Sequence, residues 1–312
     1  MTAVRSIPTE QEILGWFHTL SNWGRWGADD QRGALNLITP DVVLAALRIP
    51  NRGKVYSLGI PIGRHLTPDL GGIRPYPERL TMSTPADSGN YEQYGAAPGV
   101  GANEDLVFVP SHAGTHMDAL CHIYANGTIW NGMPDTSFGA ATGAVRCGIE
   151  HTAAFAGRFV LLDVAGHMGV DLVEPGQAIT SADLEATRAA QGTEVRSGDI
   201  LLFRTGNVEQ RLAGRRYSGT EAGLGFDAVN FVRDHDVAVV GGDNCAIEPI
   251  PFDNNVFLGV HIELLVKLGV TLVEHLNLGE LAADRCYEGF YAQGGLPVTG
   301  ATGSPVNPIA IG

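Results

Sequence analysis

Histidine and aspartate side chains that could bind a metal ion are concentrated in one short segment. Residues 111–122 read SHAGTHMDALCH, so three of the ten histidines fall within eleven residues, with one aspartate between them. Imidazole nitrogens combined with a carboxylate oxygen suit Zn²⁺, Mn²⁺ or Fe²⁺. The segment therefore predicts a metal site formed by His112, His116 and Asp118.

The backbone of this segment can bring the three side chains to one point. A strand is predicted at residues 105–110, just before the segment, and Gly114 allows the chain to turn between His112 and His116. Side chains two residues apart in a strand point to the same face, so His116 and Asp118 can reach the same ion.

His122, at the end of the segment, could have either of two roles. It could be a further metal ligand, or it could transfer protons, because the ordinary pKa of histidine lies near neutral pH. A first-row metal ion rarely takes four ligands from one short segment. We therefore favour proton transfer as the role of His122.

A second group of candidate ligands lies near the C-terminal end of the chain. His261 is expected to begin a helix over residues 261–268, and Glu274 follows the strand predicted at residues 270–273. The start of a helix and the end of the next strand lie at the same edge of a packed helix–strand pair, so the two side chains can converge. Glu263 and His275 are neighbours that could replace either of them.

The order of the predicted elements indicates an α/β fold, because strands and helices alternate after residue 158. Residues 66–104 are rich in proline and glycine and are expected to form a long loop. The other strands are predicted at residues 54–62, 159–164, 200–203 and 237–240, with closing strands within 287–311, and the other helices at residues 180–190, 226–234 and 278–283.

The chain is expected to have two parts. Residues 1–50 are interpreted as a helical N-terminal extension, with one helix near residues 9–17 and another beginning at Pro40. Residues 51–312 are interpreted as a single α/β domain.

The overall charge limits the classes of partner. With 34 acidic and 20 basic residues the formal net charge is −14, so we expect no nucleic acid and no anionic membrane as partner. Residues 1–11 contain no apolar stretch of the kind that signal peptides have. The four cysteines lie far apart, which favours a reduced cytoplasmic protein, although two disulfides remain an alternative.

The His-rich segment resembles the signature of a known family. Residues 112–122 are similar to the HxGTHxDxxxH motif of the metal-dependent cyclase family, which includes bacterial kynurenine formamidase and isatin hydrolase. Three further stretches support the resemblance to the longer members of this family. They are WGADDQRGALNLITP at residues 26–40, GDILLFRTG at 198–206 and GSPV at 303–306.

The resemblance implies a swivelling β/β/α fold of the cyclase/formamidase type, assembled as a homodimer or homotetramer. It implies hydrolysis of a cyclic or formylated amide, imide or lactone, a small-molecule substrate, by metal-bound hydroxide. One ion, Zn²⁺ or Mn²⁺, would be held by His112, His116 and Asp118. A second ion, where present, would be held by Asp118, His261 and Glu274, and His122 would be the general acid/base.

Two other functions compete with hydrolysis. An Fe(II) oxygenase could use His116, Asp118 and His261 as a facial triad, but this leaves His112 and His122 without a role. A 2-oxoglutarate enzyme would also need an arginine soon after the distal histidine, where the chain has only Lys267. A non-catalytic metal protein is disfavoured because structural zinc sites are usually closed and rich in cysteine.

Overall fold

A computed structural model describes residues 21–63, 74–215 and 219–312 of the chain. Its centre is a nine-stranded sheet with the order β1-β15-β13-β7-β9-β11-β12-β4-β14. In this order the strands span Val55–Ser57, Ile309–Ile311, Glu288–Gly294, Ala154–Asp163, Ile200–Arg204, Val239–Gly242, Thr271–Glu274, His116–Asp118 and Gly303–Pro305.

The middle of the sheet is parallel. Strand β7 pairs with β9, β9 with β11 and β11 with β12, all in parallel, whereas the other pairs of the sheet are antiparallel. Strands β9, β11 and β12 are almost continuous runs of buried residues, as expected for parallel strands covered on both faces. The predicted alternation of strands and helices after residue 158 is therefore present.

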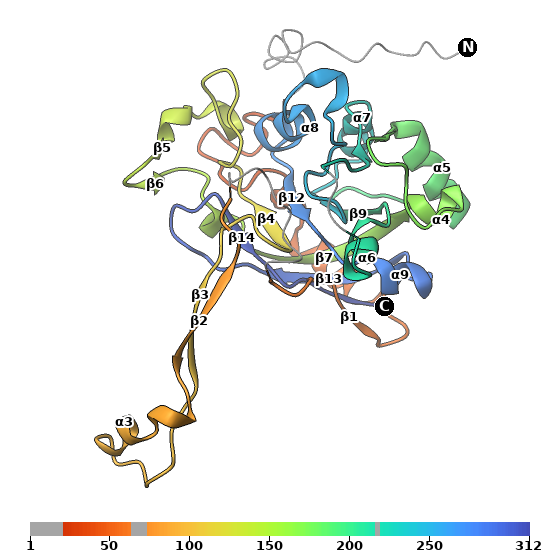
Figure 1. Cartoon of the computed structure of the whole chain (residues 1–312). Coiled ribbons are helices and arrows are strands. Elements are labelled where there is room, and N and C mark those ends of the chain that lie inside the picture. Colours follow the sequence, from red (N-terminus) through yellow and green to blue (C-terminus); the bar gives the residue numbers. More distant parts are fainter. Residues whose placement is uncertain (1–20, 64–73, 216–218) are drawn as a thin grey trace, which may run out of the picture.

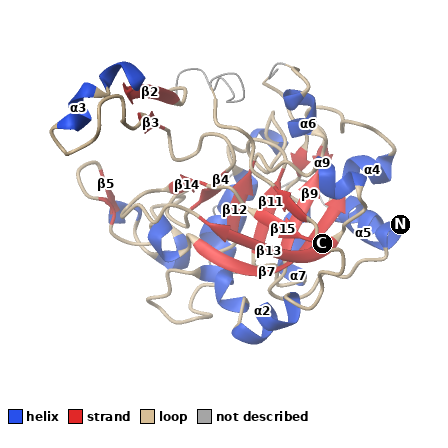
Figure 2. Cartoon of the chain, turned by 90° about the horizontal axis from the view of Figure 1, so that it is seen from below, coloured by secondary structure: helices blue, strands red, loops and turns tan. Residues whose placement is uncertain are grey.

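Helices pack against the sheet and against one another. Helices α2, α5 and α9 contact β7, α4 contacts β9, and α7 packs on α5 and η7 (Figures 1 and 2). The helical elements of the main body are η1 Gly33–Leu37, α2 Pro40–Ala46, η3 Trp130–Gly132, η4 Asp135–Ser137, η5 Ile149–His151, α4 Val164–Met168, α5 Ser181–Gln191, α6 Asn207–Leu212, α7 Ala228–Asp234, η6 Asp253–Asn255, α8 Gly259–His261, η7 Ile262–Leu268 and α9 Gly279–Ala283.

The prediction of a loop over residues 66–104 is wrong in its described part. Strand β2 (Glu78–Ser83) pairs antiparallel with β3 (Glu104–Phe108), and η2 (Pro85–Asp87) and α3 (Gly89–Glu92) lie between them. Figure 1 shows this ribbon projecting from the body with α3 near its tip. Apolar and polar residues alternate in part of both strands. The strands are short and lie among many glycines and prolines, so their pairing is not evident from the sequence.

The first predicted strand, at residues 54–62, is shorter than expected. Strand β1 ends at Ser57, because the chain then leaves the ladder and forms other bonds, such as that from the Ile60 amide to Thr115 Oγ1 at 2.9 Å. The helix expected near residues 9–17 lies outside the described residues, whereas the one beginning at Pro40 is present as α2. Two small sheets complete the strands: β8 (Ala178–Ile179) with β10 (Gly223–Leu224), and β5 (Phe138–Gly139) with β6 (Gly143–Ala144).

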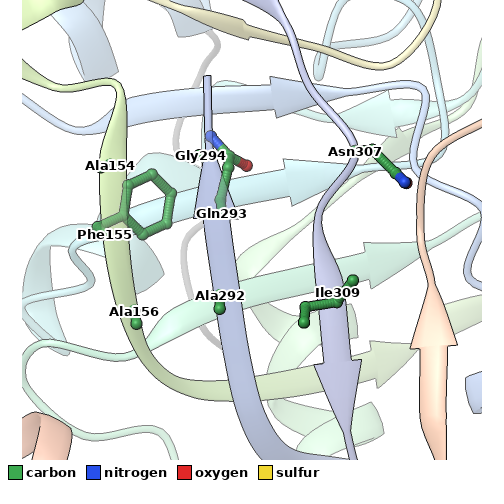
Figure 3. A pocket seen from close by; sticks show the side chains of 8 residues that line it. All are labelled: Ala154, Phe155, Ala156, Ala292, Gln293, Gly294, Asn307 and Ile309. Atoms are coloured by element: carbon green, nitrogen blue, oxygen red, sulfur yellow. The ribbon is translucent and has the colours of Figure 1, made fainter. Parts of the chain in front are cut away.

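A shallow hollow of about 540 Å³ lies over β7, β13 and β15 (Figure 3), and Gln293 in its lining contacts Met117 of β4, with Nε2 2.9 Å from Sδ. None of the residues that line it is ionisable, so it offers no acid, base or metal ligand. The lining residues are Ala154, Phe155, Ala156, Ala292, Gln293, Gly294, Asn307 and Ile309.

Two further properties of the described part bear on the expectations from the sequence. Within it, no helix is long and apolar enough to cross a membrane. All four cysteines are buried as free thiols, which argues against the alternative of two disulfides.

Candidate metal centre

The His-rich segment folds as a turn followed by the short strand β4. Gly114 adopts a φ of 65°, a conformation that side-chain-bearing residues rarely accept, and its carbonyl oxygen lies 2.9 Å from His116 Nδ1. This bond holds a proton on Nδ1, so Nε2 is the nitrogen that faces the neighbouring acids. The turn that the sequence predicted at Gly114 thus also orients the first ligand of the strand.

Strand β4 places His116 and Asp118 on one face beside Glu274. In the antiparallel pair of β4 with β12, His116 lies opposite Glu274. His116 Nε2 is 3.1 Å from Glu274 Oε2 and 3.7 Å from Asp118 Oδ1. The three side chains are buried, with at most 3% of each exposed.

His261 reaches the same point from the other side. It ends α8 and directly precedes η7, a seven-residue π-helix, an element that often occurs at functional sites. His261 Nε2 is 3.3 Å from Glu274 Oε1 and 3.8 Å from Asp118 Oδ2. The predicted convergence of His261 and Glu274 is therefore present in the structure.

His112 completes the cluster from the turn that precedes β4. Its Nε2 is 3.4 Å from Asp118 Oδ1 and 3.3 Å from the Thr302 carbonyl oxygen. A Cβ atom at Gly303 would lie only 2.6 Å from this nitrogen, so a larger residue there would displace the ring. Gly303 belongs to the closing stretch noted in the sequence, and it lies opposite Asp118 in the pair of β14 with β4.

His122 lies on the more open side of the cluster. Its ring stacks on that of His112, with centroids 3.9 Å apart, and it is only partly buried. One nitrogen of His122 lies within 4.8 Å of ligand atoms of His112 and Asp118. This position is open to either of the two roles considered for His122.

Two overlapping sets of side chains could each hold a metal ion. The first contains His112, Asp118 and His122, and the second contains Asp118, His261 and Glu274, with the ligand atoms of each set within 4.8 Å of one another. Asp118 is common to both, and His116 lies between Asp118 and Glu274. The geometry therefore accommodates one ion, or two ions that share Asp118.

Unsatisfied polar atoms indicate that the cluster suits a cation. Among the described residues, His116 Nε2, both carboxylate oxygens of Asp118 and Glu274 Oε1 are buried without a hydrogen-bond partner. Leaving such atoms unpaired is costly, and buried groups of this kind are normally bonded to protein, water or metal. Nitrogen and carboxylate oxygen are also the donor types that Zn²⁺ and Mn²⁺ accept.

The charges within the cluster shift the pKa values of its histidines in opposite directions. Burial lowers the pKa of His261, but its hydrogen bond with Glu248 and the nearby Glu274 carboxylate outweigh burial and raise the pKa to about 10. His116 behaves similarly, because Glu274 and Asp118 overcome the effect of burial and raise its pKa. For His112 and His122 burial dominates and lowers the pKa, so both imidazoles are neutral at pH 7.

Glu248 is a functional residue that the sequence analysis missed. Its Oε1 lies 2.7 Å from His261 Nδ1 and accepts the proton of that nitrogen, and the same carboxylate accepts the His261 backbone N–H at 3.1 Å. Such a carboxylate fixes the orientation of a ligating histidine. The signal in the sequence is weak, a single acid among Ala246, Ile247 and Pro249, with no metal-ligand spacing.

The two alternative ligands of the second group lie elsewhere or have other partners. Glu263 is paired with Lys267 Nζ at 2.8 Å and does not join the cluster. His275 lies beside His116, with ring centroids 5.8 Å apart, but its Nδ1 accepts a hydrogen bond from Arg211 at 3.1 Å. His261 and Glu274 are therefore the members of this group that the structure brings to Asp118.

The chain is similar to known proteins in sequence and in fold. The family model described as "Putative cyclase" matches residues 56–249. A solved structure described as a novel cyclase has a TM-score of 0.85 and 36% sequence identity, covering 95% of this chain and 99% of that chain. No curated protein matches the chain significantly.

Two more distant structures share the fold. Isatin hydrolase A from Labrenzia aggregata, bound to benzyl benzoate, has a TM-score of 0.59 at 17% identity, with 82% of this chain and 93% of that chain covered. A predicted metal-dependent hydrolase from Bacillus stearothermophilus has a TM-score of 0.52 at 20% identity, with 82% and 97% covered.

Proposed function

The chain belongs to the cyclase family, and from this premise we propose that it is a metal-dependent hydrolase of a cyclic or formylated amide, imide or lactone. The observation that carries the proposal is the buried cluster of unpaired nitrogen and oxygen atoms around Asp118. The fold shared with isatin hydrolase A supports it. The substrate is a small molecule.

The proposed ligands are those that the family resemblance implies. His112, His116 and Asp118 would hold one ion, and Asp118, His261 and Glu274 would hold a second where two are bound; the ions are Zn²⁺ or Mn²⁺. The distances support the second set as given, whereas around His112 and Asp118 they group His122 rather than His116. When bound, such an ion lowers the pKa of water towards ~7 and polarises a carbonyl group. Glu248 keeps His261 in the orientation that this role requires.

His122 is the residue that moves protons in this proposal. Its low pKa keeps the imidazole neutral at pH 7, so it can accept a proton from the attacking water. It then returns that proton to the leaving nitrogen or oxygen as the C–N or C–O bond breaks. The products are a carboxylic acid and an amine, amide or alcohol, which stay joined when the substrate is a ring.

The rival of an Fe(II) facial triad accounts for fewer of these residues. It uses His116, Asp118 and His261 but gives no function to His112 and His122, whose stacked rings border the same carboxylate. The hydrolase uses all five. We also propose the cytoplasm as the compartment, which the four free thiols support.

A hydrolysis screen on the metal-stripped and reloaded protein tests the proposal. Formylated anilines, isatin, cyclic imides and lactones are offered to the stripped chain and to chain reloaded with Zn²⁺ or with Mn²⁺. We expect hydrolysis of at least one class, lost on stripping and restored by one of the ions. Turnover by protein shown to be free of metal would overturn the mechanism, and the absence of any turnover by the loaded protein would overturn the function.

A further inference from the structure

A guanidinium group borders the metal centre. Arg74, which precedes β2, is partly buried, and its Nη1 donates a hydrogen bond to the His112 carbonyl oxygen at 2.8 Å. A guanidinium group has five N–H donors in a planar fork, so this bond uses one of them. The remaining donors can serve a ligand that enters the site.

Arg74 differs from the other arginines in its charge pairing. Burying a guanidinium group is costly unless an anion accompanies it. Among the described residues, Arg74 forms no ion pair, whereas every other arginine that is partly or fully buried has an acidic partner. These pairs are Arg158 with Asp199 and Glu288, Arg188 with Glu185, Arg204 with Asp163 and Glu209, Arg211 with Glu221, and Arg233 with Asp234.

The charge of Arg74 acts on the rings that surround the cluster. Burial is the main cause of the lowered pKa of His122, and the positive charge of Arg74 lowers this pKa further. The same charge adds to the effect of burial in lowering the pKa of His112 and of His275. The guanidinium group therefore lies near the site in which the substrate would bind.

Arg74 is set apart from the atoms that could hold a metal ion. It bonds to the backbone of His112, whereas the nitrogen of His112 that faces Asp118, Nε2, lies at the far end of the side chain, 3.4 Å from Asp118 Oδ1. The imidazole ring thus separates the guanidinium group from the candidate metal ligands. This position suits contact with a substituent of the substrate rather than with the carbonyl group that reacts.

We propose that Arg74 binds a carboxylate substituent of the substrate. The inference rests on the proposed hydrolase function and narrows its substrates to amides, imides or lactones that carry a carboxylate away from the bond that breaks. A guanidinium group matches a carboxylate in shape and can donate two parallel hydrogen bonds to it. The chain has a formal net charge of −14, so an anionic substrate needs a local positive group to attract it.

Binding of carboxylate probes in the presence of Zn²⁺ tests the inference without turnover. Benzoate has one carboxylate, which a metal ion can bind, and phthalate, isophthalate and terephthalate add a second carboxylate in three different positions. We expect at least one dicarboxylate to bind the wild-type chain about 10- to 100-fold more tightly than benzoate, as measured by titration calorimetry. Equal affinities for benzoate and all three dicarboxylates would overturn the proposal.

Three variants assign the preference to Arg74. Arg74→Gln removes the charge but keeps a donor for the His112 carbonyl oxygen, and it should lose the preference for the dicarboxylate. Arg74→Lys keeps the charge and should retain part of the preference. Arg79→Gln is the matched control and should retain all of it, because Arg79 is exposed and pairs with Asp105. A lysine variant no better than the glutamine variant would show that the charge of Arg74 is not the cause.

A purely structural role for Arg74 predicts a different result. If Arg74 only positions His112, Arg74→Gln should weaken benzoate and the dicarboxylates by the same factor, and this outcome would overturn the proposal. The test is also separate from that of the proposed function. Hydrolysis by a chain without the dicarboxylate preference refutes the carboxylate site alone, whereas an Arg74-dependent preference in a chain that hydrolyses no substrate retains the site and refutes the hydrolase.

Discussion

Two histidines of the cluster are oriented by the partner of a nitrogen that does not face the acids. For His116 this partner is the Gly114 carbonyl oxygen, and for His261 it is the Glu248 carboxylate. Both are acceptors, so both rings keep a proton on Nδ1 and present Nε2, the nitrogen that could bind a metal ion, to Asp118 and Glu274. A guanidinium group fills the corresponding position at His275, which therefore carries its proton on the opposite nitrogen.

Removing the Glu248 carboxylate should weaken metal binding. We expect Glu248→Ala to lower the affinity for Zn²⁺ by about 10- to 100-fold, because His261 loses its orientation, and Glu248→Gln to recover much of the loss. Competition with a chromophoric chelator measures the affinity. Glu263→Gln is the control, since it alters a buried carboxylate that lies outside the cluster. Wild-type affinity in Glu248→Ala would refute the orienting role.

His122 and His116 should respond differently to the same substitution. His122→Ala should keep its metal and lose roughly 10²- to 10⁴-fold in turnover, the usual contribution of a proton-transfer group. His116→Ala should lose metal affinity first. Elemental analysis and turnover numbers, measured on the same preparations, separate the two effects. An empty site in His122→Ala would show that His122 is a ligand, and the proton donor would then have to be another residue.

Metal binding should release protons at neutral pH. In the metal-free chain the pKa of His261 is raised to about 10, so this imidazole is protonated at pH 7, and the pKa of His116 is also raised. A ligating imidazole must lose this proton, so the affinity should rise as pH increases from 6 towards 9. Titration calorimetry in buffers of different ionisation enthalpy counts the protons. Binding at pH 7 without proton release would contradict these shifts.

At the scale of elements, the site is an antiparallel addition to the edge of a parallel sheet. Strand β12 ends the parallel part with Glu274, and β4 and β14 extend it with His116, Asp118 and Gly303. The helix–π-helix unit of α8 and η7 contacts η3, and η7 also packs on β12 and brings His261 over this edge. Three separate segments of the chain, those of β4, of α8 to β12 and of β14, thus meet at the Asp118 carboxylate.

Gly303 tests whether the closing strand shapes the site. We expect Gly303→Ala to lower metal affinity by about tenfold or more, because the new Cβ atom would lie 2.6 Å from His112 Nε2 and 2.7 Å from the Met117 carbonyl oxygen, so the ring and strand β4 must shift. Gly294→Ala is the matched control, since a Cβ atom there meets nothing within 4 Å. Equal metal affinity in the two variants would show that metal binding does not depend on the space at Gly303.

The elements that could be predicted are those with local signals. The helix predicted at residues 180–190 and the strand predicted at residues 200–203 are confirmed as α5, which begins with a capping box of Thr180 and Asp183, and β9. The strand predicted at residues 105–110 is present as β3, whereas β2 was missed because it is short and lies in a stretch rich in proline and glycine. Likewise Glu248 lacked a signal, because its partner His261 is thirteen residues away and meets it only through tertiary structure.

At the scale of the whole molecule, the sequence predicted the fold class and family correctly. The α/β fold of the cyclase type and the family itself are confirmed by the family model and by the structure with 36% identity. The family could be predicted from the HxGTHxD motif because all its residues lie close together, on the turn at Gly114 and on strand β4. The division of the chain at residue 50 and the assignment of the metal ligands stay predictions. The first concerns whether the two parts fold independently, and the second concerns bound ions.

The most direct test of the central claim is a crystal structure of the full chain loaded with Zn²⁺, measured at the zinc absorption edge. The account predicts one or two anomalous peaks per chain beside Asp118, each at about 2.0–2.2 Å from its histidine and carboxylate ligands. His116 Nε2 and Asp118 are expected among the ligands. An anomalous map with no peak at this cluster, or with zinc bound only elsewhere, would contradict the account.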